Sequence, residues 1–189
     1  MSASAMNRSN VLTIGIATIW LAVLGSWVIS AQDKYTVKVP GGLAFSEFKG
    51  YEGWQAVSMT RKERVVEIIL ANPLMIDSYY AGIPANCQPV PDGAKIAKII
   101  WTPKQDAFFP DATVPGELRS VDFMEKDSTR FAESGGWGYA LFDYDAGSKT
   151  FKPGTKASTP PQGNNARCGF ACHSSAKARD YVFTEYGKR

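Results

Sequence analysis

A short segment near the end of the chain combines residue types with distinctive chemistry. Residues 167–173 read RCGFACH, so Cys168 and Cys172 lie close together and His173 directly follows the second. In c-type haem attachment, two thiols add to the vinyl groups of the porphyrin, and the adjacent imidazole becomes an axial iron ligand. The segment therefore predicts one covalently bound haem c, tethered by Cys168 and Cys172, with His173 as the metal ligand.

Two features of this motif point in opposite directions. Haem-attachment motifs usually have two residues between the cysteines, whereas this one has three. His173, however, is the only histidine in the chain, and chance would rarely place it directly after a close cysteine pair. Two other interpretations remain open. Cys168 and Cys172 could form a disulfide, or they could bind a metal with His173 and the distant Cys87.

The sixth coordination position of such a haem cannot be filled by a second histidine, because the chain has none. The remaining candidates are a lysine or one of Met59, Met75 and Met124. Each methionine lies in an apolar stretch, where packing in the core is the simpler interpretation. An open or water-filled position is therefore expected. A five-coordinate haem binds or transforms small ligands, whereas a six-coordinate haem mainly carries electrons.

The composition is that of an ordinary globular protein. Hydrophobic residues make up 44% of the chain and charged residues 21%, and the length is sufficient for one domain with a substantial core. The formal charge of +3 is small, and no cluster of lysines and arginines indicates binding to nucleic acid.

Residues 1–31 have the pattern of a targeting segment. Arg8 precedes an uncharged, mostly apolar run over residues 11–29, and residues 30–31 are small enough for a cleavage site. The run is also long enough to span a bilayer, so an uncleaved membrane anchor is the alternative. In both cases residues 32–189 are the haem domain and are delivered across a membrane. In a bacterium this address is the periplasm, where haem c is attached.

The remaining residues predict an α+β fold, mainly an antiparallel β-sheet with a few short helices. Strands are expected where β-branched and aromatic residues gather between turn signals, at residues 55–60, 63–70, 94–101, 118–124 and 137–144. One helix should begin at Pro73 behind Asn72, with others after Asp127 and through the cysteine motif. Residues 34–45, 104–117, 145–165 and 180–186 are expected to form an extended lead-in, two loops, and a terminal strand or tail.

Three segments resemble the cytochrome P460 family. They read PDGAKIAKIIW at residues 91–101, SGGWGYALFDYD at 134–145 and CGFACHSSAKARDYVFTEYGKR at 168–189. The resemblance extends over about residues 54–189 and includes the order of signal segment, β-rich domain and C-terminal haem motif. It implies a mainly antiparallel β fold, a homodimer and one haem c per subunit.

The resemblance also implies one of two activities. One branch of the family oxidises hydroxylamine and has a lysine–porphyrin crosslink. The other branch, the β-type cytochromes c-prime, lacks the crosslink and binds nitric oxide behind an apolar wall. We therefore expect a periplasmic haem protein that acts on a small nitrogen species and has a periplasmic electron-transfer partner. Two alternatives stay open: a cytochrome that only transfers electrons, and a secreted module with a disulfide and no haem.

Lys98 is the candidate for such a crosslink. The alternation of residues 94–101 places Lys98 on one face of a strand with Ile96 and Ile100, where a desolvated amine is more readily neutral and nucleophilic. Lys95 is the competing candidate on the opposite face. A solvated lysine or one that protects a sheet edge is the simpler interpretation of Lys98.

Other side chains are candidates for the surroundings of the haem, each with a plainer interpretation. Lys177 and Arg179 could pair with propionates or belong to a solvated basic tail. Glu133 and Asp143 are candidate proton acceptors, and the sequence does not favour either. Four aromatic residues of predicted strands could line the haem pocket or fill the core: Phe123, Trp137, Tyr139 and Phe142.

Overall fold

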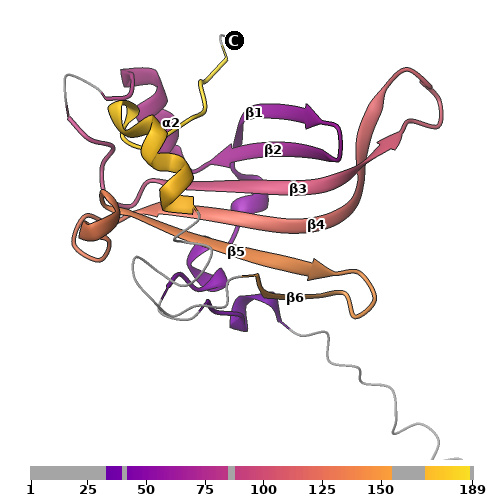
Figure 1. The fold of residues 1–189 in the computed structure, drawn as a ribbon, viewed down its shortest axis with the longest axis horizontal. Coiled ribbons are helices and arrows are strands. Elements are labelled where there is room, and N and C mark those ends of the chain that lie inside the picture. The colour runs from indigo at the N-terminus through magenta and orange to yellow at the C-terminus, as the bar shows by residue number, and fades with distance from the viewer. Residues whose placement is uncertain (1–32, 40–41, 85–87, 155–168, 188–189) are drawn as a thin grey trace, which may run out of the picture. The chain divides into compact units, whose positions relative to one another are not determined.

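One six-stranded antiparallel sheet forms the centre of the molecule, and each strand pairs with the next in chain order (Figure 1). The computed structural model describes residues 33–39, 42–84, 88–154 and 169–187. The predicted α+β fold is confirmed. The strands are β1 (Gln55–Lys62), β2 (Val65–Ala71), β3 (Lys95–Gln105), β4 (Thr113–Lys126), β5 (Trp137–Asp145) and β6 (Thr150–Pro153).

One face of the sheet is covered by residues that precede β1. They form three short 3-10 helices, η1 (Lys34–Thr36), η2 (Phe45–Phe48) and η3 (Tyr51–Gly53). Within the expected extended lead-in at residues 34–45, η1 is helical, whereas Lys38 forms a β-bridge with Ala44. Phe45 lies at the centre of this layer, with ring centroids 4.9 Å from Phe142 and 5.2 Å from Phe123. Such aromatic pairs contribute about 0.5–1.5 kcal/mol each beyond the area they bury. This face is therefore closed by a dense aromatic core.

The opposite face is covered by α2 (Pro73–Ala81) and by the C-terminal residues, which include η5 (Ser174–Arg179) (Figure 1). Met75 and Ile76 of α2 pack with Trp137 and Val182 in a second hydrophobic cluster. Residues 169–173 are helical, as predicted for the cysteine motif. The two clusters lie on the two faces because successive residues of a strand point to opposite sides.

The helix α2 begins where the sequence predicts. The Asn72 side chain accepts a hydrogen bond from the backbone N–H of Met75 at 3.1 Å, and Pro73 occupies the first turn. The same Asn72 oxygen accepts from the N–H of Lys95 at 2.9 Å, and its amide donates to the carbonyl of Gly93 at 2.9 Å. One side chain thus caps the helix and joins it to the start of β3.

Two expectations about loops are wrong in part. Residues 104–105 and 113–117 are strand, because β3 and β4 continue into a long hairpin. Pro103 and Pro115 lie opposite each other beside register shifts, where the missing N–H groups are tolerated. The expected loop at residues 145–165 contains β6 in its described part, and residues 155–165 lie outside the described residues. Residues 182–186 form no strand, so the tail is the alternative that holds, and it begins after Asp180 and Tyr181, which both adopt a positive φ.

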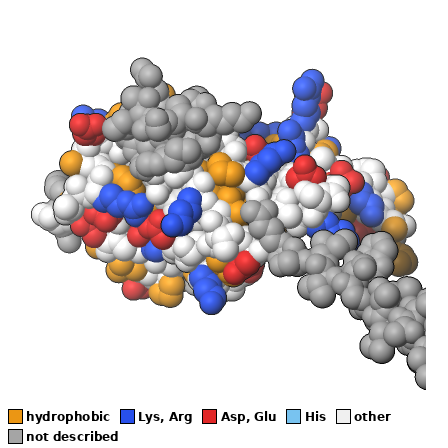
Figure 2. Space-filling view, turned by 90° about the horizontal axis from the view of Figure 1, so that it is seen from below, with side chains coloured by type: hydrophobic (Ala, Val, Ile, Leu, Met, Phe, Trp, Pro, Cys, Tyr) orange, Lys and Arg blue, Asp and Glu red, His pale blue; other side chains and the backbone are white. Residues whose placement is uncertain are grey.

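Charged side chains of both signs are interspersed on the surface. On the face shown in Figure 2, outside the grey atoms, basic and acidic side chains alternate without a large patch of one sign. Several charged side chains of the described residues form ion pairs, including Arg130 with Glu47 at 2.6 Å. Within the described ranges, no helix is long and apolar enough to cross a bilayer. The segment 1–31 lies outside those ranges.

We predict that Asn72→Ala lowers the free energy of unfolding by about 2 kcal/mol, because it removes the cap of α2 and the link to β3 together. Asn72→Asp should cost less, since a carboxylate still accepts from Met75 and Lys95 but cannot donate to Gly93. Urea unfolding of the purified protein measures both values. Asp77→Ala, at an exposed position of α2, is the control and should change stability by less than about 0.5 kcal/mol. Equal stability of Asn72→Ala and the unmodified protein would contradict the role of Asn72 as the cap of α2 and its link to β3.

Candidate haem site

A cavity of about 490 Å³ opens on the face of the sheet that carries α2 and the C-terminal residues. Strands β1 to β5 supply one wall, and residues of the C-terminal segment, including Cys172 and His173, supply the other. Most of the lining is apolar, with Ile69, Ile96 and Leu141 among its residues. Its volume lies within the range of about 300–1,000 Å³ that is usual for cofactor and ligand sites.

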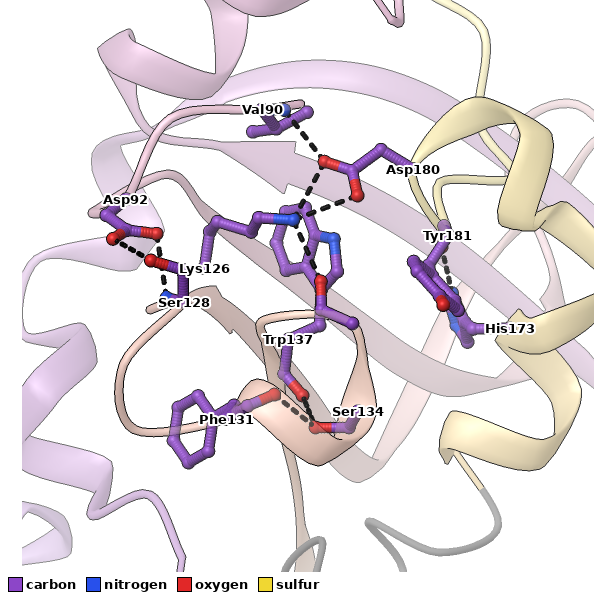
Figure 3. Close-up of polar contacts among 11 residues, drawn as sticks. Val90, Asp92, Lys126, Ser128, Phe131, Ser134, Trp137, His173, Asp180 and Tyr181 are labelled. Carbon is purple, nitrogen blue, oxygen red and sulfur yellow. Dashed lines mark hydrogen bonds and ion pairs between the residues drawn. The ribbon is translucent and has the colours of Figure 1, made fainter. Parts of the chain in front are cut away.

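His173 is held in one orientation at the edge of this cavity (Figure 3). Its Nδ1 lies 2.6 Å from the carbonyl oxygen of Tyr181. A carbonyl can only accept, so Nδ1 carries the proton and the lone pair of Nε2 remains available to a metal. The imidazole also packs against Tyr139 and Phe183, with ring centroids at 5.2 and 4.8 Å.

The protonation state of His173 suits an iron ligand. Burial lowers the pKa of His173 below its usual value, and the positive charge of Lys98 lowers it further, while the hydrogen bond to Tyr181 opposes both. The imidazole is therefore neutral at neutral pH. Neutral imidazole with a hydrogen-bonded Nδ1 is the form that binds metals in proteins.

The helical turn that carries Cys172 lies directly on β5. A Cβ atom at Gly169 would be only 2.9 Å from Cδ1 of Tyr139, so a larger residue there would push the turn away from the sheet. Cys172 is exposed and lines the cavity next to His173. Cys168 and Cys87 lie outside the described residues, so the tether at Cys168 and the alternatives of a disulfide or a metal site stay predictions.

Lys98 points into the cavity and Lys95 points away from it. The Nζ atom of Lys98 lies 2.6 Å from a carboxylate oxygen of Asp122, and both residues line the cavity. Lys95 lies on the other face, where its Nζ donates to the carbonyl of Glu47 at 2.7 Å. The sequence alone did not choose between the two lysines. Of these two lysines, Lys98 lines the cavity that contains His173, while the crosslink itself stays a prediction.

Two carboxylates of the cavity were not among the sequence candidates. Asp122 lies opposite Lys98 in the pairing of β3 with β4, and burial raises its pKa although Lys98 opposes this. Glu67 of β2 also lines the cavity, and its carboxylate lies 2.6 Å from the Nζ atom of Lys62. The signal that could have found Asp122 is the opposite charge directly across a hairpin, but using it requires the correct register.

The other candidates are divided by the two faces of the sheet. Trp137 and Tyr139 lie on the cavity face, where Tyr139 lines the cavity and Trp137 is buried, whereas Phe123 and Phe142 belong to the aromatic core of the other face, with Phe123 also bordering the cavity. Glu133 and Asp143, proposed as proton acceptors, are not among the lining residues.

The three candidate methionines differ in burial, and the two basic residues after the motif differ in their contacts. Core packing is confirmed for Met75 and Met124, of which Met124 also lines the cavity, and is wrong for Met59, which is 68% exposed. Lys177 is exposed. Arg179 donates to the carbonyl oxygens of the C-terminal residues 183 and 184.

The residues present fit a c-type haem. An apolar cavity of suitable size is bordered by a thiol and by a neutral imidazole whose Nδ1 is already hydrogen-bonded. Cys172 would hold the porphyrin and His173 would bind its iron, which would supply a site for redox chemistry on a small ligand. Within the described part of the chain, no group of three or more His, Cys, Asp or Glu residues is placed to hold a separate metal ion.

Comparison with known proteins agrees with this chemistry. The sequence model of the family described as cytochrome P460 matches residues 48–184, well over half of the chain. The match includes all six strands, Lys98, Asp122 and the cysteine–histidine motif. None of the curated proteins compared with the chain matches it significantly.

We predict that the protein, made in a cell with c-type haem maturation, gives a haem-stained band on a denaturing gel, because thioether bonds survive denaturation. His173→Ala should keep the stain, since the tether depends on the cysteines, but it should lose the iron–imidazole vibration in the Raman spectrum of the reduced protein. No stained band in the unmodified protein, with both thiols free or joined in a disulfide, would contradict the haem assignment. A stained His173→Ala protein with an unchanged spectrum would show that His173 is not the ligand.

Proposed function

The chain belongs to the cytochrome P460 family and is therefore a c-type haem protein, and on this basis we propose that it oxidises hydroxylamine in the periplasm. The observation that carries the proposal is the position of Lys98. It lies in the same cavity as His173, paired with Asp122, where its side chain is 35% exposed. A lysine at the haem site is the feature expected of the hydroxylamine-oxidising branch.

Asp122 supplies the second requirement of this reaction. Oxidation of hydroxylamine releases protons, so a base is needed near the substrate. Burial raises the pKa of Asp122, which makes its carboxylate a better proton acceptor than an exposed one. This carboxylate lies 2.6 Å from the Nζ atom of Lys98, and the haem, when bound, would supply the redox centre.

Nitric oxide binding is the second candidate function. The apolar lining, with Ile69, Ile96 and Leu141, favours it, because a small neutral gas needs no charged partner. The two candidate functions differ in the expected bonding of Lys98. Hydroxylamine oxidation in this family is associated with a covalent bond from a lysine to the porphyrin, whereas gas binding leaves the Lys98–Asp122 ion pair intact. A pure electron-transfer role is less favoured, since no second histidine exists to fill the sixth position.

The location and the partners follow from the same proposal. Residues 1–31 would deliver the domain across the inner membrane as a cleaved signal or as an anchor. Electrons taken from the substrate require an acceptor, so a periplasmic electron-transfer protein is the expected partner. We also propose a homodimer, the usual state in the family.

We predict that digestion of the haem-loaded protein yields one species in which the β3 peptide containing Lys98 is joined to the peptide of residues 168–173 through the porphyrin. Mass spectrometry identifies it, and the Soret band of the intact protein should lie far to the red. Lys98→Ala should remove both signals. Lys95→Ala is the matched control and should keep them, because Lys95 lies on the other face. A haem peptide linked only through cysteines in the unmodified protein would favour nitric oxide binding instead.

We predict that Asp122→Asn lowers kcat for hydroxylamine oxidation by about 100-fold, the usual minimum for losing a positioned base. In the unmodified protein, kcat should rise with pH as Asp122 loses its proton, at a pH above the usual pKa of an aspartate, because burial raises that pKa. This rise should be absent from Asp122→Asn. Asp143→Asn, a carboxylate that is not among the cavity residues, is the control and should behave as the unmodified protein. An unchanged kcat and pH profile in Asp122→Asn would exclude Asp122 as the base.

A further inference from the structure

We propose that the buried ion pair between Lys126 and Asp180 positions His173. The pair holds in place a backbone corner, formed by Asp180 and Tyr181, and the carbonyl of Tyr181 binds the imidazole. The inference rests on the proposed role of His173 as iron ligand. Neither Lys126 nor Asp180 is among the residues that line the cavity, so both would act through Tyr181 and not by touching the haem.

The ion pair is buried, and Figure 3 shows its contacts. The Nζ atom of Lys126, at the end of β4, lies 2.9 Å from each carboxylate oxygen of Asp180 and 3.0 Å from the carbonyl oxygen of Gly135. The two side chains are only 4% and 10% exposed. Asp180 also accepts from the N–H of Val90 at 2.7 Å, and the ammonium lies 5.1 Å from the ring of Trp137. All three ammonium protons therefore have acceptors.

The corner that this pair holds is unfavourable by itself. Asp180 has φ 46° and Tyr181 has φ 63°, so two successive residues with side chains occupy the left-handed region. Such a conformation costs of order 1–3 kcal/mol for each residue and persists only where surrounding contacts determine it. The carboxylate of Asp180, bonded on one side to Lys126 and on the other to Val90, supplies those contacts.

The corner contacts His173, the proposed iron ligand, directly. The carbonyl of Tyr181 accepts from Nδ1 of His173 at 2.6 Å, and the direction of that carbonyl is set by the backbone of the corner. The ring of Tyr181 packs so closely on Gly135 that a Cβ atom there would lie 2.2 Å from Cε2 of the ring. Gly135 thus contacts Tyr181 through its Cα and Lys126 through its carbonyl. The ion pair, the glycine turn and the corner form one connected unit.

Breaking the pair should change the bond to His173 specifically. Lys126→Met leaves the carboxylate of Asp180 buried without its cation, and a buried charge in that state moves toward water or a new partner. The corner then loses its defined geometry, and the Nδ1–H···O bond lengthens. Because this hydrogen bond raises the basicity of the ligating nitrogen, its loss weakens the iron–imidazole bond.

The test uses the full-length, haem-loaded, reduced protein and two readouts of the proximal bond. The chain has one histidine, so its Nδ1–H gives a single exchangeable proton resonance that needs no assignment. In Lys126→Met we expect that proton to exchange with deuterium about tenfold faster or more, since opening of the bond is easier. The iron–imidazole stretching band in the Raman spectrum should shift to lower frequency. Asp180→Asn, which keeps the tolerance for a positive φ but removes the charge, should change both readouts in the same direction and serves if Lys126→Met does not fold.

A control of equal disruption separates positioning from general stability. Phe142→Leu leaves a cavity in the aromatic core on the opposite face and should lower the melting temperature without altering either readout. The inference is overturned if Lys126→Met or Asp180→Asn loses stability but keeps the exchange rate and the band of the unmodified protein. It is also overturned if Phe142→Leu changes both readouts as strongly. Absence of an iron–imidazole band in the unmodified protein would instead contradict the ligand role of His173, and thereby the premise.

Discussion

The register between β3 and β4 decides which side chains meet in the cavity. Lys98 lies directly opposite Asp122, and Ile96 lies opposite Met124, all on the cavity face. Lys95, opposite Glu125, belongs to the other face. Because side chains alternate with a period of two, a slip of one residue would move Lys98 into the aromatic core and bring a different set to the cavity. The hydrophobic residues between these charges oppose such a slip, since it would expose them.

The two faces of the sheet are packed differently. One face is filled by Phe45, Phe48 and Phe123, which are buried with almost no exposed surface, and this packing makes the strands a rigid base. The other face is only partly filled, so a cavity remains between the strands and the C-terminal segment. The polar groups of the site project from strands, which hold side chains more firmly than loops do. The histidine projects from the C-terminal segment and therefore needs its own means of orientation.

The sequence predicted the elements whose signals are local. The cap at Asn72, the strand at residues 137–144 and the helical turn of the cysteine motif depend on neighbouring residues, and all three were found. The long β3–β4 hairpin was missed because Pro103 and Pro115 indicate a loop, and only the pairing across the hairpin shows that they occupy tolerated positions. Asp122 was missed for the same reason. Its role depends on which residue of another strand it faces, and no local pattern contains that information.

The ion pair of Lys126 and Asp180 is hard to explain as a source of stability alone. Removing two charges from water is costly, and an apolar pair of similar volume would often stabilise a core as well or better. An apolar contact, however, permits sliding and rotation, whereas an ammonium with three acceptors and a carboxylate with a backbone donor allow few arrangements. A corner with two positive φ values needs such a restraint, because relaxed conformations of the backbone lie close by in energy. The carbonyl of Tyr181 must meet the Nδ1 of the only histidine, and a chain with no second histidine cannot substitute another imidazole if that contact fails. Directional bonds at this corner therefore serve the orientation of one imidazole, which is a requirement that hydrophobic packing does not meet.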